Sequence, residues 1–293
     1  MRRLPRRFRL ALPVALILAA AACSTSGSPA PSGGTPAPSP TAGPLGIEHP
    51  TGATDLVFRF EEGGGFVAPG FLATEGPAFS LYGDGTTIFR DQTQVAPQPI
   101  GNVLPGVPYQ IVRLTEEQIQ ALLQFAIGPG GLAVARAHYD LPVADAPTAT
   151  FTLVAGGTHK TVSVNGLGFG AGQTGVDAAV LTELEGLRTR LTTFGSDVVG
   201  EHAWSPDRFR GILTADGFNP PKAWPWPAVS PSDFVKHDGP NDPSFPIRTM
   251  TPAEVAALGV PGIDGGVQGL TLQAADGKTY EFRLRPLLPD EPY

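Results

Sequence analysis

Residues 148–164 read TATFTLVAGGTHKTVSV, in which two strand candidates, Thr150–Val154 and Thr161–Val164, flank Gly156-Gly157. Glycine tolerates the positive φ angles that a two-residue hairpin turn requires, so the pair favours a tight reversal of the chain. The stretch therefore predicts an antiparallel hairpin.

Similar signals lie on both sides of this hairpin. Asp-Gly dipeptides between strand candidates are strong hairpin signals, and those at Asp84-Gly85 and Asp276-Gly277 lie in such a place. The strands that we expect from these patterns are Leu56–Phe60, Phe79–Tyr82 paired with Thr86–Phe89, and Leu270–Leu272 paired with Tyr280–Leu284.

Three helices are expected. The first has Thr115 as N-cap and Gln118 at its third position, a capping box, and a second spans Val176–Thr192 with leucines along one side. The third begins at Thr251, with Glu254 at its third position, and ends at Gly259. Apolar pairs that staple the first and third helix starts are Leu114 with Ile119 and Met250 with Val255.

The order of these elements predicts an α+β fold, with antiparallel sheets and hairpins packed against a few helices. A capped helix followed by a hairpin occurs in both halves, which leaves two alternatives open: a diverged duplication, or chance recurrence of a common unit. We expect a first α+β sub-domain over residues 55–195 and a second, similar one over residues 196–293.

The beginning of the chain predicts export. Five arginines precede an apolar run, Leu10–Ala22, that is too short to span a bilayer as a helix, as in a signal peptide. The residues Ala20-Ala21-Ala22-Cys23 resemble a lipobox, although alanine stands at residue 20 where leucine is commoner. We expect a signal peptide over residues 1–22 and a lipidated Cys23. The alternative is an ordinary cleavage that leaves a secreted protein with a free thiol.

A tether is expected after the cysteine. Residues 23–54 are rich in proline, serine and glycine and hold few large apolar groups, so they cannot repay the entropy of ordering. This composition predicts a disordered segment that links the lipid, for example palmitate or diacylglycerol, to a folded body.

Composition limits the partners. Loss of residues 1–22 leaves 15 basic against 27 acidic residues, a net charge of −12, which repels nucleic acid and anionic lipid headgroups. Cys23 is the one cysteine of the chain, so an internal disulfide is excluded. We therefore expect contact with the membrane through the N-terminal lipid and no nucleic-acid partner.

The motifs for cofactors, metals and catalysis are weak. Residues 170–175 match the dinucleotide pattern G-x-G-x-x-G, but they follow an antiparallel hairpin, which favours a flexible loop. The five histidines lack zinc spacing, and neither a G-x-S-x-G nor an S-x-x-K motif is present. The adjacent pairs Glu61-Glu62 and Glu116-Glu117 are expected at the solvated surface. We therefore expect no cofactor, no metal site and no catalytic residue.

The candidate ligand contacts are Trp224 and Trp226 in the sequence Trp-Pro-Trp-Pro. Prolines hold such a segment extended, and exposed indoles stack on sugar rings or on a partner's prolines. The alternative is that one or both indoles cap the core of the second half.

Several short stretches together resemble uncharacterised lipoproteins and secreted proteins of high-GC Gram-positive bacteria: residues 63–67 (GGGFV), 81–85 (LYGDG), 139–140 with 145–148, and 285–289 (RPLLP). The resemblance implies a place on the extracytoplasmic face of the cell membrane and no particular activity. With the motifs above, we expect a non-catalytic binding or interaction module for an envelope protein or glycan. The alternatives are the solute-binding component of a transporter and an envelope hydrolase.

Overall fold

The computed structural model describes residues 46–91, 93–169, 175, 177–215, 217, 219–237 and 245–292. The chain from Gly46 onward forms one compact unit. The predicted signal peptide, Cys23 and most of the predicted tether lie outside the described residues.

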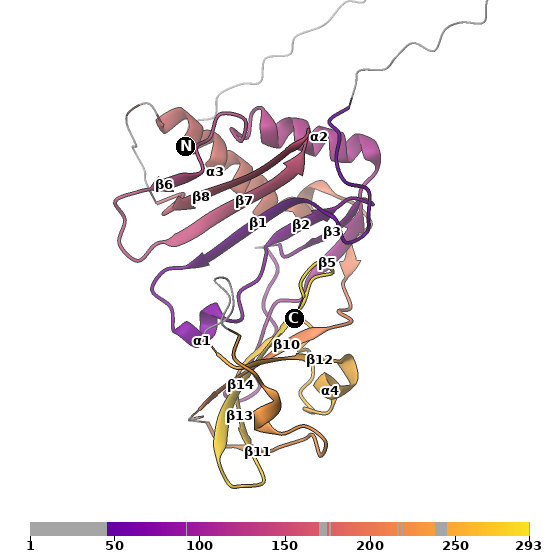
Figure 1. The fold of residues 1–293 in the computed structure, drawn as a ribbon, viewed down its shortest axis with the longest axis vertical. Coiled ribbons are helices and arrows are strands. Elements are labelled where there is room, and N and C mark those ends of the chain that lie inside the picture. The colour runs from indigo at the N-terminus through magenta and orange to yellow at the C-terminus, as the bar shows by residue number, and fades with distance from the viewer. Residues whose placement is uncertain are drawn as a thin grey trace, which may run out of the picture. The chain divides into compact units, whose positions relative to one another are not determined.

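The first sheet holds eight strands among the described residues, in the order β6-β8-β7-β1-β2-β3-β5-β9 (Figure 1). Neighbours run antiparallel except β6 and β8, which are parallel. The strands are β1 Leu56–Gly64, β2 Phe79–Tyr82, β3 Thr86–Phe89, β5 Gln110–Arg113, β6 His138–Asp140, β7 Pro147–Ala155, β8 Thr158–Asn165 and β9 His202–Ala203.

The hairpin of β7 and β8 confirms the prediction from residues 148–164. Gly156 and Gly157 form its turn with φ angles of 60° and 69°, a conformation that favours glycine at both positions. Phe151 pairs with Val162 across the ladder, and both are buried. Less buried residues alternate with them along both strands, so one face of the hairpin joins the core and the other is partly accessible to solvent.

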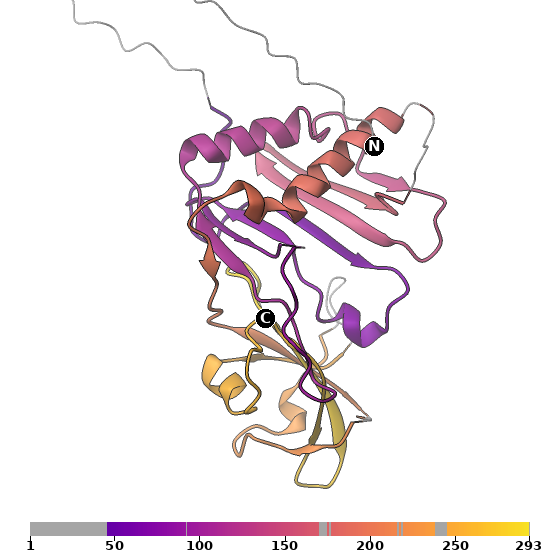
Figure 2. The same cartoon turned by 180° about the vertical axis from the view of Figure 1, so that it is seen from behind.

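Two helices, α2 (Glu116–Ile127) and α3 (Ala178–Thr192), lie on the same face of the first sheet (Figure 2). The predicted capping box of α2 is confirmed, because Thr115 Oγ1 accepts from the Gln118 N–H at 3.3 Å and Gln118 Oε1 accepts from the Thr115 N–H at 2.9 Å. Residues buried between these helices and the sheet include Ile119, Leu122, Leu123, Ala126, Leu181, Leu184, Leu187 and Leu191.

The second sheet has the order β11-β13-β14-β10-β12, and β4 pairs with β13. The predicted hairpin around Asp276-Gly277 is present as β13 and β14. The remaining elements are β4 Leu104–Pro105, β10 Phe209–Ala215, β11 Lys222–Ala223, β12 Ile247–Met250, β13 Val267–Gln273, β14 Thr279–Pro286, α1 Pro69–Leu72, α4 Pro252–Ala256 and 3₁₀ turns at Phe194–Asp197 and Pro231–Asp233.

The α+β fold with antiparallel sheets is therefore confirmed, and helix followed by hairpin recurs as predicted, although α4 has five residues where α2 has twelve. The expected division after residue 195 is only approximate. β4 belongs to the second sheet although it lies early in the chain, and β9 belongs to the first although it follows residue 196. Pairings between residues distant in sequence interleave the two halves.

The last part of the predicted tether, residues 46–54, is not free of the body. Ile47 exchanges two hydrogen bonds with the Gln120 side chain of α2, at 2.7 and 2.8 Å, and Glu48 O accepts from the Gly156 N–H at 2.7 Å. These bonds join the segment to α2 and to the β7–β8 turn. The folded body therefore begins before Asp55, where the composition alone had placed its start.

Candidate functional site

Both candidate tryptophans belong to the core of the second sheet. Trp226 is only 4% exposed and donates its indole N–H to Glu254 O at 2.7 Å, and the half-buried Trp224 donates to Val229 O at 2.6 Å. Their ring planes stand at 86° to each other. The structure thus agrees with the alternative that the indoles cap the core, and the interpretation of Trp226 as an exposed ligand contact is wrong.

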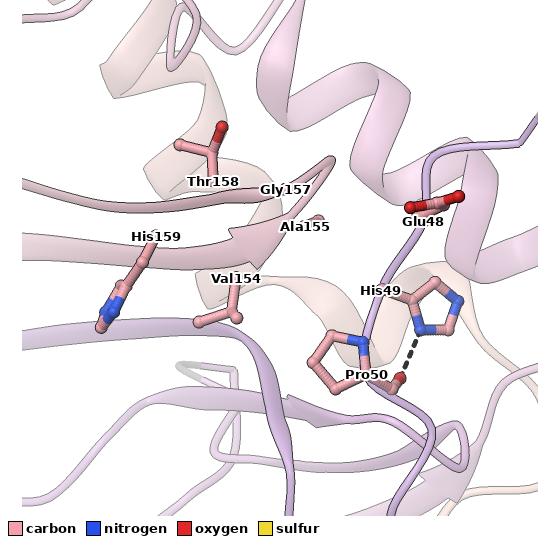
Figure 3. Close-up of a pocket in the computed structure, with 8 residues that line it drawn as sticks. All are labelled: Glu48, His49, Pro50, Val154, Ala155, Gly157, Thr158 and His159. Carbon is pink, nitrogen blue, oxygen red and sulfur yellow. Dashed lines mark hydrogen bonds between the residues drawn. The ribbon is translucent and has the colours of Figure 1, made fainter.

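A shallow pocket lies where residues 48–50 cross the β7–β8 hairpin (Figure 3). Its two histidines do not converge: His49 turns its Nδ1 toward Pro50 O at 2.6 Å, and His159 lies on the other side of Val154. His49 Nε2 lies 3.2 Å from both Glu116 carboxylate oxygens. Since both ring nitrogens of His49 are engaged within the protein, this pocket offers no paired acid and base.

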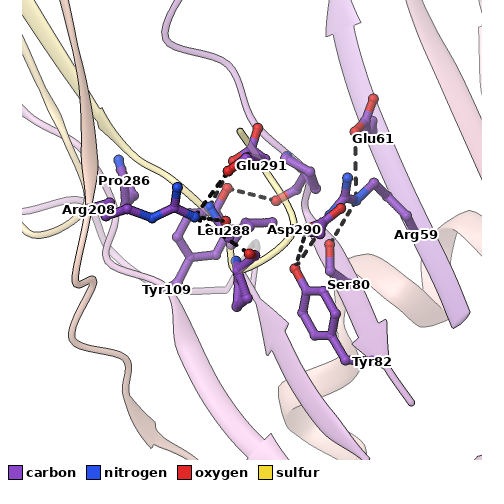
Figure 4. A network of polar contacts seen from close by, with 12 residues as sticks. Arg59, Glu61, Ser80, Tyr82, Tyr109, Arg208, Pro286, Leu288, Asp290 and Glu291 are labelled. Carbon is purple, nitrogen blue, oxygen red and sulfur yellow. Dashed lines mark hydrogen bonds and ion pairs between the residues drawn. The ribbon is translucent and has the colours of Figure 1, made fainter. Parts of the chain in front are cut away.

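A network of buried charges joins the two sheets (Figure 4). Asp290, in the segment after β14, accepts from Arg59 of β1 at 2.7 Å and from the Tyr82 hydroxyl of β2 at 2.8 Å. Arg59 also donates to Ser80 Oγ at 3.0 Å. Burial raises the pKa of Tyr82, and the negative charge of Asp290 raises it further, so the phenol stays protonated and donates.

The neighbouring carboxylate of Glu291 forms hydrogen bonds with the second sheet. It accepts from both terminal nitrogens of Arg285, on β14, at 2.9 and 2.5 Å, and from the Leu288 N–H at 2.8 Å. Burial would raise the pKa of Glu291, but the hydrogen bonds and charge of Arg285 outweigh burial and lower it. The adjacent residues Asp290 and Glu291 therefore connect the two sheets, the first through hydrogen bonds to β1 and β2 and the second through hydrogen bonds to β14.

A separate cavity of about 300 Å³ is lined by residues of α1, the loop around β4 and the start of β13. Val267 and Leu284 supply buried apolar surface, while Phe71 and Leu104 at the rim are 41% and 51% exposed. This combination of apolar walls with a few charged groups is typical of small-molecule sites. We call it the junction pocket.

Arg90 is the cationic group of the junction pocket. Its guanidinium lies over the ring of buried Tyr109, 4.0 Å from the centroid, and its Nη2 donates to Gly265 O at 2.8 Å. Its Nε is buried and has no hydrogen-bond partner among the described residues. Because this Nε has almost no accessible surface, an anion in the cavity would meet the rest of the charged Arg90 side chain, which lines it.

Glu75 is the acidic group of the same pocket. Its Oε2 accepts from the Gly64 N–H at 3.1 Å. Burial raises the pKa of Glu75 above its usual value, and the Gly64 hydrogen bond offsets only part of that effect. The sequence contained no signal for either residue, because Arg90 and Glu75 come to line one cavity only through the tertiary packing of segments distant in sequence.

The predictions for the adjacent glutamate pairs have different outcomes. Glu116 and Glu117 lie exposed in the first turn of α2 as expected, but Glu62 is largely buried and pairs with Arg188 of α3 at 2.8 Å. Among the described residues, no group of three or more His, Cys, Asp or Glu side chains is placed to hold a metal ion. The glycine motif at residues 170–174 and Cys23 lie outside the described residues.

Within the described part of the chain, none of the helices combines the length and apolar character needed to cross a membrane. No protein-family model, curated protein or solved structure matches this chain.

Proposed function

We propose that this protein is a lipid-anchored module on the extracytoplasmic face of the cell membrane, which binds a small ligand in the junction pocket without transforming it. Cys23 would carry the lipid, and residues 24–45 would link it to the body. The observation that carries the proposal is the presence, in one cavity, of apolar walls and two charged side chains, Arg90 and Glu75, that form no ion pair with any other described residue.

The contents of the pocket favour binding over hydrolysis. Its described lining holds one carboxylate, Glu75, and no histidine, whereas glycoside hydrolysis needs two facing carboxylates and most acyl transfer needs a nucleophile beside a base. The predominantly antiparallel sheets give no support to the two βαβ lobes expected of a transporter's solute-binding component.

Native mass spectrometry of the full chain, purified from its own cells in mild detergent, tests this proposal. We expect a small-molecule adduct on the wild-type protein that is lost from Ala96→Trp, because Ala96 lines the pocket and an indole there would cover it. Ala144→Trp, in an exposed turn that does not line the pocket, is the matched control and should keep the adduct.

Two outcomes contradict the proposal. One is an adduct that survives Ala96→Trp unchanged, which would place the ligand elsewhere. The other is the absence of any adduct from the wild-type protein at ligand concentrations present in the cell envelope.

A further inference from the structure

The two charged residues of the junction pocket have no charged partners. No ion pair within 4.0 Å joins Arg90 or Glu75 to another described residue, nor to each other, although both line the same cavity. Elsewhere near the junction, buried arginines are matched: Arg59 pairs with Asp290 and Arg285 with Glu291. The pocket thus presents one positive and one negative group that form no ion pair within the described part of the chain.

From this arrangement we infer that the junction pocket binds a small zwitterion with an apolar side group, of the free amino acid or short peptide class. Its carboxylate would accept from Arg90 and its ammonium group would donate to Glu75. This inference rests on the proposed function, and it names the chemistry of the ligand at that site.

Charge complementarity separates a zwitterion from simpler ligands. An apolar carboxylate would satisfy Arg90 but bring a second negative charge into the pocket of Glu75. An apolar amine would satisfy Glu75 and leave the positive charge of Arg90 without a counter-charge. Like charges in a partly desolvated site repel, and buried donors without acceptors are costly, so a ligand that carries both charges has the advantage.

The walls define the apolar part of the ligand. Val267 and Leu284 are 2% and 0% exposed and form fixed surface, while Phe71 and Leu104 at the rim offer exposed apolar surface to a side group. A cavity of about 300 Å³ lies at the small end of ligand sites. It therefore fits an amino acid or a short peptide better than a long lipid chain.

The wall that carries Gly265 is fixed before any ligand arrives. Gly106 donates its N–H to Gly266 O at 2.9 Å, and a Cβ at Gly265 would come within 2.3 Å of Gly106 O. On the other side, Gln268 donates to Thr74 Oγ1 at 2.9 Å, which ties the segment after α1 to β13. A preformed pocket costs less ordering entropy on binding.

Isothermal titration of the full chain in detergent tests the inference. A panel of apolar L-amino acids and their dipeptides is titrated first, and the best binder is then compared with its N-acetyl derivative, which lacks the ammonium group, and its amide, which lacks the carboxylate. We expect each derivative to bind roughly ten- to a hundredfold more weakly, because hydrogen bonds to charged groups contribute about that much. These comparisons need no change to the protein.

Variants assign each charge to its residue. Arg90→Gln should weaken binding of the zwitterion and remove the difference in affinity between the amino acid and its amide. Glu75→Gln should remove the difference in affinity between the amino acid and its N-acetyl derivative. Arg113→Gln is the control, since Arg113 is 72% exposed on β5 and is not in the pocket lining. Circular dichroism of each variant confirms that the fold is retained.

The inference is overturned if no member of the panel binds, or if acid, amide and acetylated forms bind equally. It is also overturned if Ala96→Trp abolishes ligand binding while Arg90→Gln and Glu75→Gln leave the affinity unchanged. That last result would leave the proposed binding function intact, whereas an adduct insensitive to Ala96→Trp would refute the function itself.

Discussion

The buried ion pair between Arg285 and Glu291 predicts a large loss of stability in the variant Glu291→Gln. Arg285 is 4% exposed, and both its terminal nitrogens donate to the Glu291 carboxylate. Glutamine keeps the shape of the side chain but leaves a buried guanidinium without a counter-charge. Removal of one partner from a buried ion pair costs about 3–5 kcal/mol, and we expect a loss of that size here.

Urea unfolding followed by tryptophan fluorescence measures this loss, with Asp276→Asn as the control. Asp276 lies 3.3 Å from Lys278, but both side chains are largely exposed, so its replacement should leave the urea midpoint almost unchanged. The double variant Arg285→Met/Glu291→Leu removes both charges and should recover much of the loss. A cost below about 1 kcal/mol for Glu291→Gln, or no recovery in the double variant, would refute the reasoning.

The same pair predicts a pH dependence. Because the pKa of Glu291 is lower in the folded protein than its unfolded value of about 4.3, its stabilising contribution is complete above that value and is lost as the pH falls through the folded pKa. The difference in stability between wild type and Glu291→Gln should therefore be constant near neutral pH and shrink in acid. A difference that grows below pH 4 would contradict the sign.

Three further predictions concern the chain ends and a helix cap. Cys23→Ser should release the protein from the membrane fraction, and mass spectrometry of the wild type should find diacylglycerol on Cys23; a soluble wild type with a free thiol would exclude the anchor. Deletion of residues 24–45 should leave the thermal midpoint of unfolding within about 2 °C of the wild-type value. Deletion of residues 24–50 should lower the midpoint by about 5–10 °C, because the three hydrogen bonds of Ile47 and Glu48 are lost. Equal midpoints for the two deletions would show that these bonds do not stabilise the body. Thr251→Ala should cost about 1 kcal/mol in urea unfolding and Thr251→Ser less, since Thr251 Oγ1 accepts from the Glu254 N–H at 3.3 Å; equal losses would mean that the cap is not the cause.

Local sequence patterns predicted the elements well. Thr115 and Thr251 both form the capping boxes that their spacing indicates, and the hairpins at Gly156-Gly157 and Asp84-Gly85 are present. Each of these features depends on residues a few positions apart, whose hydrogen bonds and φ preferences are fixed by their own chemistry. Such features need no knowledge of the rest of the chain.

Features made by distant residues were not predictable in this way. Residues 46–54 have the composition of a tether, yet Ile47 is held by Gln120, 73 positions further along the chain. Trp226 has an unusual local setting, yet the structure buries it against Phe282 of β14. In both cases tertiary contacts overrode the local pattern, because burial and hydrogen bonding to other elements outweigh local preference.

The junction pocket is the clearest example. Arg90 follows β3, Glu75 follows α1, and Gly265 precedes β13, so no window of the sequence contains them together. An unpaired arginine is a structural observation, since its meaning depends on which carboxylates the fold brings near it. The candidate ligand chemistry therefore depends on tertiary contacts that no local stretch of the sequence contains.

A crystal structure of the protein with its best-binding apolar amino acid would show whether the junction pocket holds a zwitterion. We predict density in the junction pocket, with the ligand carboxylate beside the Arg90 guanidinium and its ammonium group beside Glu75. Density elsewhere, or a ligand in the pocket with its carboxylate turned away from Arg90, would contradict the account.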